Sequence, residues 1–226
     1  MSSSRERVRQ LAQEFIAKGS PLGWFEVLYD TAQGDANQIP WADGEPNRNL
    51  TTWLDRQQVH GQGQKALVVG CGLGEDAEYL AQLGFAVTAF DIAPTAIRWS
   101  QERFPISAVD YVVGDVLALA ESWQKQFAFI LEAYTLQVLP AQLRPQAMRQ
   151  IAGCLSAGGV LLVIARGREP DEAPGLTPPW PLTHTELAYF QKLGLDEIQF
   201  EDYLDGETRR FRVQYRPSAP HERILL

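Results

Sequence analysis

The stretch of sequence that decides the fold is Ala66-Leu-Val-Val-Gly-Cys-Gly-Leu-Gly-Glu-Asp-Ala-Glu-Tyr-Leu80. A short apolar run enters a turn that contains Gly70, Gly72 and Gly74, and an amphipathic segment follows it. Glycine permits a tight turn and removes the side chains that would keep a ligand away from the main chain. The stretch predicts a buried strand, a ligand-binding turn and a helix, although a plain strand-to-helix turn explains an isolated match equally well.

The rest of the chain from residue 65 alternates short apolar runs with amphipathic segments, which is typical of βαβ units on a parallel sheet. Strands are expected at 65–70, 85–91, 109–114, 127–132 and 159–166. Helices are expected at 74–83, 94–103 and 141–154, with a shorter one near 117–124. The pattern therefore predicts an α/β fold.

The C-terminal part carries two local signals. Thr183 followed by Glu186 forms a capping-box pattern that predicts a helix up to Lys192. Two runs rich in strand-forming residues, 195–204 and 208–215, flank Asp205-Gly206, which is a strong hairpin signal.

The N-terminal part is expected to cover the core. A helical spacing of apolar residues spans 4–18, and a further helix is expected from Leu50 to Val59. Between them, residues 22–50 are rich in turn-forming residues, which predicts irregular or short helical structure with buried aromatic anchors. We expect residues 1–60 to form a helical or irregular cover over the active site and residues 61–226 to form the core.

Acidic residues follow successive predicted strands. Asp91 ends the second strand, Asp115 follows the third, and Glu132 ends the fourth. Ligands of open α/β sheets bind at the carboxyl edge, where an acid can accept hydrogen bonds from ribose hydroxyl groups. One such acid is easily a solvated loop carboxylate, but three together favour a nucleotide-like ligand.

The spacing of the glycines argues against a dinucleotide. A dinucleotide fingerprint places its third glycine, or an alanine, three positions after the second, and Glu75 stands there. A nicotinamide-dependent oxidoreductase is therefore the weaker alternative.

With these motifs the chain, from about Trp41 to Arg216, resembles the class I S-adenosylmethionine-dependent methyltransferases. The resemblance implies a Rossmann-like seven-stranded, mostly parallel sheet of order 3-2-1-4-5-7-6, with the last strand antiparallel and helices on both faces. It implies S-adenosyl-L-methionine as cofactor, with the glycine loop at its methionine end, Asp91 at the ribose and Asp115 at the adenine. The full set of cofactor-binding residues that it implies is Trp41, Gly70, Cys71, Gly72, Gly74, Asp91, Ile92, Asp115, Val116 and Glu132. One departure is Val68, which stands where many members carry an acid.

The segment Ile39-Pro-Trp-Ala-Asp-Gly-Glu-Pro46 resembles the Pro-Trp-Asp-x-Gly element of thiopurine S-methyltransferase-like proteins. Ala42 stands in place of the acid of that element, with Asp43 one position later. The resemblance implies a thiol or another soft nucleophile as the methyl acceptor.

The acceptor-binding residues are expected among aromatic and polar side chains near the same edge. A thiolate needs little help from a general base, and no convincing catalytic base is visible. His60, His184 and His221 are all expected at the surface, so the catalytic residues stay unknown. The predicted substrate-binding residues are Trp24, Phe25, Tyr29, Tyr134, Gln137 and Arg166.

Composition limits the other possibilities. The 226 residues carry a formal net charge of −8, which disfavours nucleic acid as a partner. The apolar stretches are shorter than the roughly 20 residues of a membrane helix, and the N-terminus lacks a secretory pattern. Only two cysteines are present, so neither a disulfide framework nor a metal cluster is expected, and a cytoplasmic location fits best.

The sequence therefore predicts a methyltransferase that acts on a small molecule. Two alternatives remain open: a nicotinamide-dependent oxidoreductase, and a non-catalytic protein that binds S-adenosylmethionine. The identity of the acceptor and the oligomeric state are not predicted.

Overall fold

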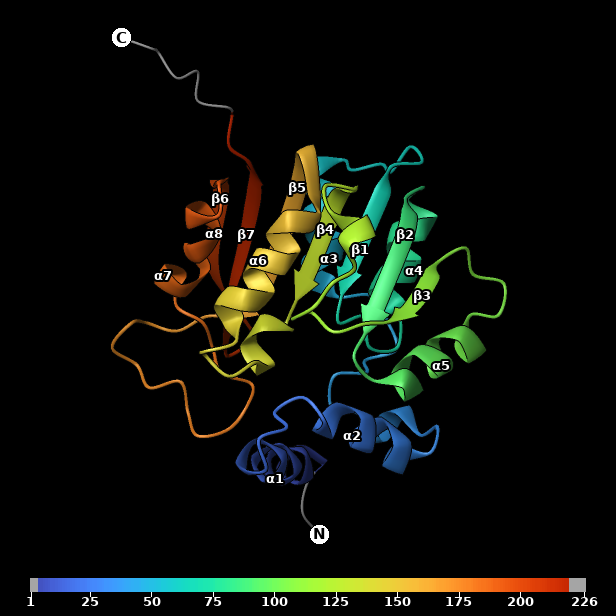
Figure 1. Cartoon of the computed structure of the whole chain (residues 1–226), viewed down its shortest axis with the longest axis vertical. Helices are drawn as coiled ribbons and strands as arrows, with labels where there is room; N and C mark the ends of the chain where they lie inside the picture. The colour runs from blue at the N-terminus through green and yellow to red at the C-terminus, as the bar shows by residue number, and fades with distance from the viewer. Residues whose placement is uncertain (1–3, 220–226) are drawn as a thin grey trace.

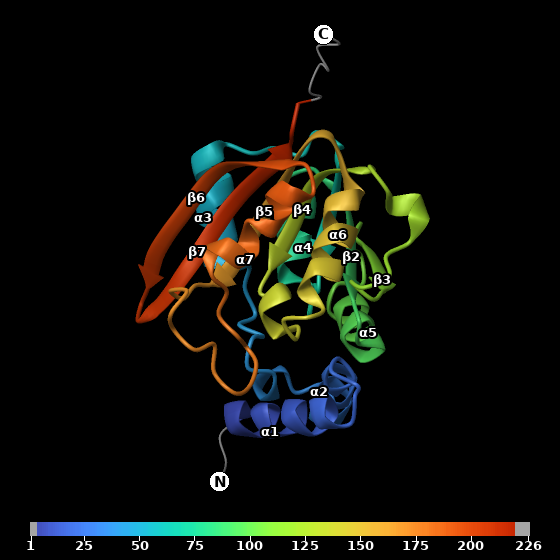
Figure 2. The same ribbon diagram turned by 60° about the vertical axis from the view of Figure 1, so that its left-hand side comes forward.

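A computed structural model describes residues 4–219 and contains one seven-stranded sheet (Figures 1 and 2). The strand order β3-β2-β1-β4-β5-β7-β6 confirms the predicted topology. Only β7 runs antiparallel to its neighbours, β5 and β6. The strands are β1 (Lys65–Val69), β2 (Ala86–Asp91), β3 (Asp110–Val113), β4 (Phe127–Ala133), β5 (Leu155–Arg166), β6 (Leu195–Asp205) and β7 (Thr208–Pro217).

Helices cover both faces of this sheet. One face packs against α6 and the short helices α7 and α8, and the other packs against α3 and α4. Strands covered on both sides are apolar along most of their length, which explains the hydrophobic runs 66–69 of β1 and 127–131 of β4. The helices are α1 (Ser4–Ala17), α2 (Trp24–Ala32), α3 (Arg48–Gln57), α4 (Glu75–Gln82), α5 (Pro94–Arg103), α6 (Arg144–Cys154), α7 (His184–Leu187) and α8 (Tyr189–Lys192).

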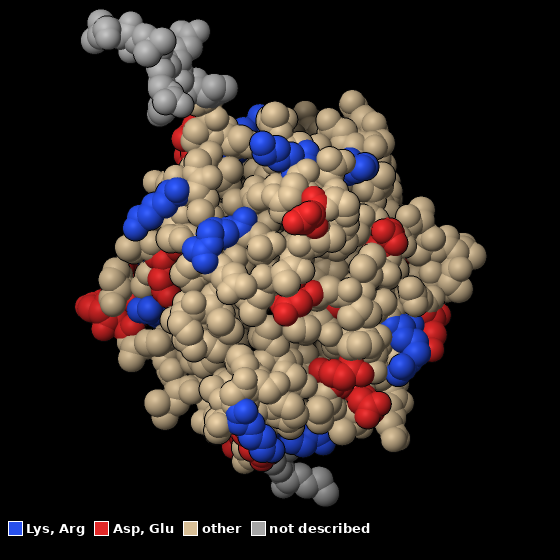
Figure 3. Space-filling model, viewed as in Figure 1, with Lys and Arg blue, Asp and Glu red and all other residues tan. Residues whose placement is uncertain are grey.

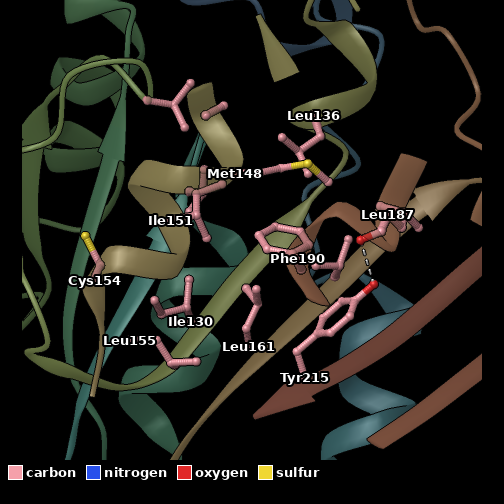
Figure 4. Close-up of a cluster of buried hydrophobic side chains, with 14 of the residues drawn as sticks. Ile130, Leu136, Met148, Ile151, Cys154, Leu155, Leu161, Leu187, Phe190 and Tyr215 are labelled. Carbon is pink, nitrogen blue, oxygen red and sulfur yellow. Dashed lines mark hydrogen bonds between the residues drawn. The ribbon is translucent and has the colours of Figure 1, made fainter. Parts of the chain in front are cut away.

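The core on the α6 side ties the C-terminal hairpin to the sheet (Figure 4). Phe190 and Tyr215 pack with their ring centroids 5.1 Å apart. The buried Tyr215 hydroxyl donates a hydrogen bond to the carbonyl oxygen of Leu187 at 3.1 Å. A buried polar group with a partner avoids a large desolvation cost, so the pair fixes α7 against β7.

Three elements differ from their predicted form. The segment expected to be helical near 117–124 contains only a 3-10 turn at Glu121–Trp123. The helix expected up to Lys192 is divided at Ala188 into α7 and α8, although its predicted capping box is present. Strand β5 begins at Leu155 and not at the predicted residue 159, and it follows α6 directly without a loop.

The N-terminal helices α1 and α2 lie below the carboxyl edge of the sheet (Figures 1 and 2). Their buried residues form a third apolar cluster with residues from the glycine loop and α5. Trp24 and Tyr29 are the largest anchors, each 1 % exposed. Trp41, one of the aromatic residues of segment 22–50 that were expected to be buried anchors, is 39 % exposed, although its ring meets those of Trp24 and Tyr29 edge-on.

Among the helices of residues 4–219, none has the length and the apolar character that a membrane-spanning helix requires. On the face shown in Figure 3, basic and acidic side chains of the described residues alternate without forming one large patch of either sign.

Candidate functional site

The glycine loop joins β1 to α4 and has a backbone that only glycine adopts easily. Gly70, Gly72 and Gly74 have φ values of +63°, +54° and +93°. A Cβ at Gly70 would lie 2.3 Å from Thr135 Oγ1, and one at Gly72 would lie 3.3 Å from the Tyr29 hydroxyl. Both the conformation and the close neighbours therefore require glycine here.

Asp91, the last residue of β2, accepts a hydrogen bond from the backbone of this loop. Its Oδ2 accepts a hydrogen bond from Gly72 N at 3.0 Å, and its Oδ1 accepts one from Ala93 N at 2.9 Å. Burial raises the pKa of Asp91, and these backbone donors oppose the rise. The carboxylate is thus held in one orientation beside the glycines.

The other residues predicted to meet the nucleoside lie along the same edge. Asp115 Oδ1 accepts a hydrogen bond from Leu117 N at 2.8 Å, and Val116 is buried beside it. Ile92 and Cys71 are half-buried. Burial raises the pKa of the Cys71 thiol well above its usual range, so this thiol stays protonated and is a poor nucleophile.

Glu132 near the end of β4 is fully buried and supports the loop that follows it. Its Oε1 accepts hydrogen bonds from Thr135 N and Leu136 N, both at 2.8 Å, whereas its buried Oε2 has no partner among the described residues. Burial raises the pKa of Glu132 to about 7. The hydrogen bonds from Glu132 to Thr135 N and Leu136 N close a turn that contains Tyr134. Tyr134 has a φ of +67°, which is uncommon for an aromatic residue.

Aromatic side chains from the N-terminal segment lie over the glycine loop. The Trp41 indole Nε1 donates a hydrogen bond to the Tyr29 hydroxyl at 2.9 Å. Trp24 stacks on Phe25 with their ring centroids 3.8 Å apart, and the Trp41 ring meets both edge-on. The structure therefore brings these four predicted residues together.

The side chain of Gln137 contacts the backbone of Arg166. Gln137 Oε1 accepts a hydrogen bond from Arg166 N at 2.8 Å, and the Gln137 carbonyl oxygen accepts one from Trp180 N at 2.7 Å. Gln137 thus braces the end of β5 against the segment that leads to α7.

A polar cluster that the sequence did not reveal lies beside Tyr134. Asn49 Nδ2 donates a hydrogen bond to the Tyr134 hydroxyl at 3.1 Å, and Asn49 Oδ1 accepts one from the Tyr203 hydroxyl at 2.6 Å. The Arg210 guanidinium lies 5.0 Å from the centroid of the Tyr134 ring. Asn47, the N-cap of α3, was the one local signal for this region, because asparagine is favoured at helix starts.

The histidines do not supply a positioned base to these residues. His60 is exposed after α3, and the His184 ring lies 2.9 Å from Glu197 and stacks on Phe200. His221 lies outside the described residues.

Residues 66–159 match the family described as a methyltransferase domain. The chain is 26 % identical over 156 residues to a 2-heptyl-1-hydroxyquinolin-4(1H)-one methyltransferase from Mycobacteroides abscessus, covering 67 % of this chain and 66 % of the relative. It is 34 % identical over 110 residues to a ubiquinone biosynthesis O-methyltransferase from Xanthomonas campestris, covering 48 % of this chain and 45 % of the relative. The matches thus span somewhat less than two thirds of the first relative and under half of the second.

The fold also matches a solved structure of 1,6-didemethyltoxoflavin-N1-methyltransferase from Burkholderia thailandensis, which contains S-adenosylhomocysteine. The two share 16 % identity with a TM-score of 0.68, over 97 % of this chain and 92 % of the other. Residues 66–159 thus match a methyltransferase-domain family, and the whole chain has the fold of this methyltransferase structure.

Proposed function

We propose that this protein transfers a methyl group from S-adenosylmethionine to a small molecule bound at the carboxyl edge of the sheet. The observation that carries the proposal is the hydrogen bond between Asp91 and the glycine loop. Both lie within residues 66–159, which match the methyltransferase-domain family. When bound, this cofactor supplies an electrophilic methyl group on a positively charged sulfur.

The residues at this edge fit that cofactor. The main chain at Gly70 and Gly72 presents no side chain to a ligand, and Asp91 offers carboxylate oxygens to the ribose. Glu132 adds a buried carboxyl group whose Oε2 has no hydrogen-bond partner among the described residues. It holds Thr135, which packs on Gly70 of the glycine loop. The remaining cofactor contacts that we propose involve Trp41, Cys71, Gly74, Ile92, Asp115 and Val116.

Within residues 1–60, the part that precedes α3 acts in this proposal as a cover that limits the access of water, whereas α3 packs on the face of the sheet. Tyr29 and Trp41 are joined by a hydrogen bond directly over Gly72, so they would shield a cofactor held at the glycine loop from solvent. Excluding water and aligning the acceptor with the sulfonium supplies much of the acceleration of a displacement reaction. Trp24, Phe25, Tyr134, Gln137 and Arg166 are the proposed surroundings of the acceptor.

The acceptor that we favour loses its proton without a catalytic base. Among the described histidines, His60 is exposed and His184 is engaged by Glu197, so neither is placed to remove a proton at the loop. A thiol or another soft nucleophile meets this requirement. The thiopurine S-methyltransferase-like subgroup, suggested by residues 39–46, stays a prediction.

A hydroxylated aromatic ring is the second candidate acceptor, because a hydroxyquinolone and an O-methylation appear in the names of the two relatives. An acidic hydroxyl group would equally react without a base.

An assay with radiolabelled S-adenosylmethionine tests both candidates. The protein is incubated with a panel of aromatic and aliphatic thiols and with hydroxyquinolines of matched size. Methylation of thiols alone supports the first candidate, and methylation of hydroxyquinolines alone supports the second. Binding of S-adenosylmethionine without any product across the panel would favour a non-catalytic binding protein.

A further inference from the structure

Three elements bring hydrogen-bond donors together beside Tyr134. Asn47 and Asn49 lie at the start of α3, Tyr134 follows β4, and Arg210 lies on β7. Asn49 links α3 to Tyr134 through its side-chain amide, and Arg210 lies over the Tyr134 ring. The cluster is therefore assembled by the fold and is not a local sequence feature.

Two nitrogen atoms of this cluster, Asn47 Nδ2 and Arg210 Nε, are buried without a hydrogen-bond acceptor within residues 4–219. Arg210 is 15 % exposed and forms a long ion pair with the partly exposed Asp205, with Nε 3.5 Å from Oδ2 but without an aligned hydrogen bond. The same Asp205 Oδ2 accepts a hydrogen bond from Asn49 Nδ2 at 3.3 Å. In the same part of the chain, the Tyr134 hydroxyl accepts a hydrogen bond from Asn49 but donates none. Since buried donors without acceptors are costly, the cluster suits a ligand that supplies acceptor oxygens.

The cluster lies on the side of the loop away from the proposed nucleoside contacts. Asp91 and Asp115 follow β2 and β3, whereas β7 lies beyond β4 and β5 on the opposite side of β1. With a spacing of about 4.8 Å between strands, β7 is roughly 14 Å from β1. Thr135, which follows Tyr134, packs on Gly70, so the cluster adjoins the glycine loop that we propose as part of the cofactor site.

The backbone at Tyr134 is held in an unfavourable conformation. Its φ of +67° is unfavourable for a residue with a Cβ, and the buried Glu132 fixes the following amides. Strain of this kind concentrates at ligand sites, where it fixes a side chain in place.

We propose that Asn47, Tyr134 and Arg210 bind an anionic oxygen, a carboxylate or an ionised hydroxyl group, on the molecule that is methylated. This proposal rests on the proposed function, because it needs the cofactor at the glycine loop. Tyr134 and Asn47 donate hydrogen bonds to the oxygen, and Arg210 supplies the opposite charge. Charge-assisted bonds of this type distinguish an anion from a neutral group of the same shape.

The test is a calorimetric titration of protein saturated with S-adenosylhomocysteine, using 2-naphthoate and the uncharged 2-naphthamide as probes. Wild-type protein is expected to bind 2-naphthoate at least tenfold more tightly than 2-naphthamide. In Arg210→Met the preference falls below threefold. Arg216→Met, a control at the exposed far end of β7, keeps the wild-type preference.

Tyr134→Phe provides a second variant that removes only the hydroxyl group, and it is expected to reduce the preference at least threefold. Wild-type protein that binds both probes equally, or neither of them, overturns the proposal, as does a preference that survives in both variants. A loss of S-adenosylhomocysteine affinity in Arg210→Met would assign the cluster to the cofactor carboxylate and would also overturn it. Failure of wild-type protein to bind S-adenosylhomocysteine contradicts the proposed function instead.

Discussion

At the scale of single residues, Asp91 is the side chain on which cofactor binding should depend most. It is 7 % exposed and its two oxygens are bonded to Gly72 and Ala93. Hydrogen bonds to charged groups contribute about 1.5 to 3 kcal/mol, so Asp91→Ala should weaken S-adenosylhomocysteine binding by more than about 1 kcal/mol. Calorimetry measures this, with the exposed Asp110→Ala as control. Unchanged affinity in Asp91→Ala would contradict its assignment.

Glu132 should make the stability of the protein depend on pH. Its pKa rises from an ordinary 4.5 to about 7 on burial, so between these values the folded state binds more protons than the unfolded state. Glu132 therefore adds its full stabilising contribution to the free energy of unfolding below pH 4.5. This contribution is lost as the pH rises through 7. Glu132→Gln removes this dependence.

Urea denaturation at pH 5 and pH 8 measures the effect. Relative to Glu132→Gln, wild-type protein should lose about 1 kcal/mol or more of stability between the two values. The exposed Glu121→Gln should follow wild-type protein at both. Parallel behaviour of wild type and Glu132→Gln would show that Glu132 titrates normally.

At this scale the sequence predicted the residues that follow strands and missed those that meet across the fold. Asp91, Asp115 and Glu132 were visible because each closes an apolar run. The partnership of Asn49, Tyr134 and Arg210 was not visible, because it joins residues far apart in the chain through the pairing of β5 with β7. The roles of the predicted site residues stay predictions until binding is measured.

At the scale of elements, the glycine loop should tolerate no side chain at its first position. In Gly70→Ala the new methyl group would approach Thr135 Oγ1 to 2.3 Å at a φ of +63°. Gly63→Ala is the matched control, because its φ of +77° is similarly strained but no atom lies within 4 Å. Overpacking costs typically about 1–3 kcal/mol, so Gly70→Ala should lower the free energy of unfolding by at least 1 kcal/mol more than Gly63→Ala. Equal losses in thermal denaturation would contradict the packing against Thr135.

The prediction of elements succeeded where an apolar run is bounded by turn signals and failed where the apolar residues are isolated. The strands and the hairpin at Asp205-Gly206 were found because each strand is a compact run of apolar or strand-forming residues. Residues 117–124 gave only a 3-10 turn, since Leu117 and Leu119 pack on the core without needing a helix. The division at Ala188 follows no sequence signal that we recognise.

At the scale of the whole molecule, the N-terminal cover should respond to the cofactor. Tyr29 and Trp41 lie over Gly72, so a ligand at the loop should reduce the opening of residues 24–41. Hydrogen exchange in this segment should slow at least threefold when S-adenosylhomocysteine is added. The exchange rates of α6, which packs on one face of the sheet, should stay unchanged. Equal slowing throughout the chain would indicate general stabilisation and no specific closure.

The measurement that tests the central claim most directly is a parallel titration of the purified protein with S-adenosylmethionine, S-adenosylhomocysteine and NAD. The glycine loop, the strand-end carboxylates and the methyltransferase domain match together predict micromolar binding of the two adenosyl ligands and no binding of NAD. Binding of NAD alone would contradict the proposed function and would make the loop a dinucleotide site.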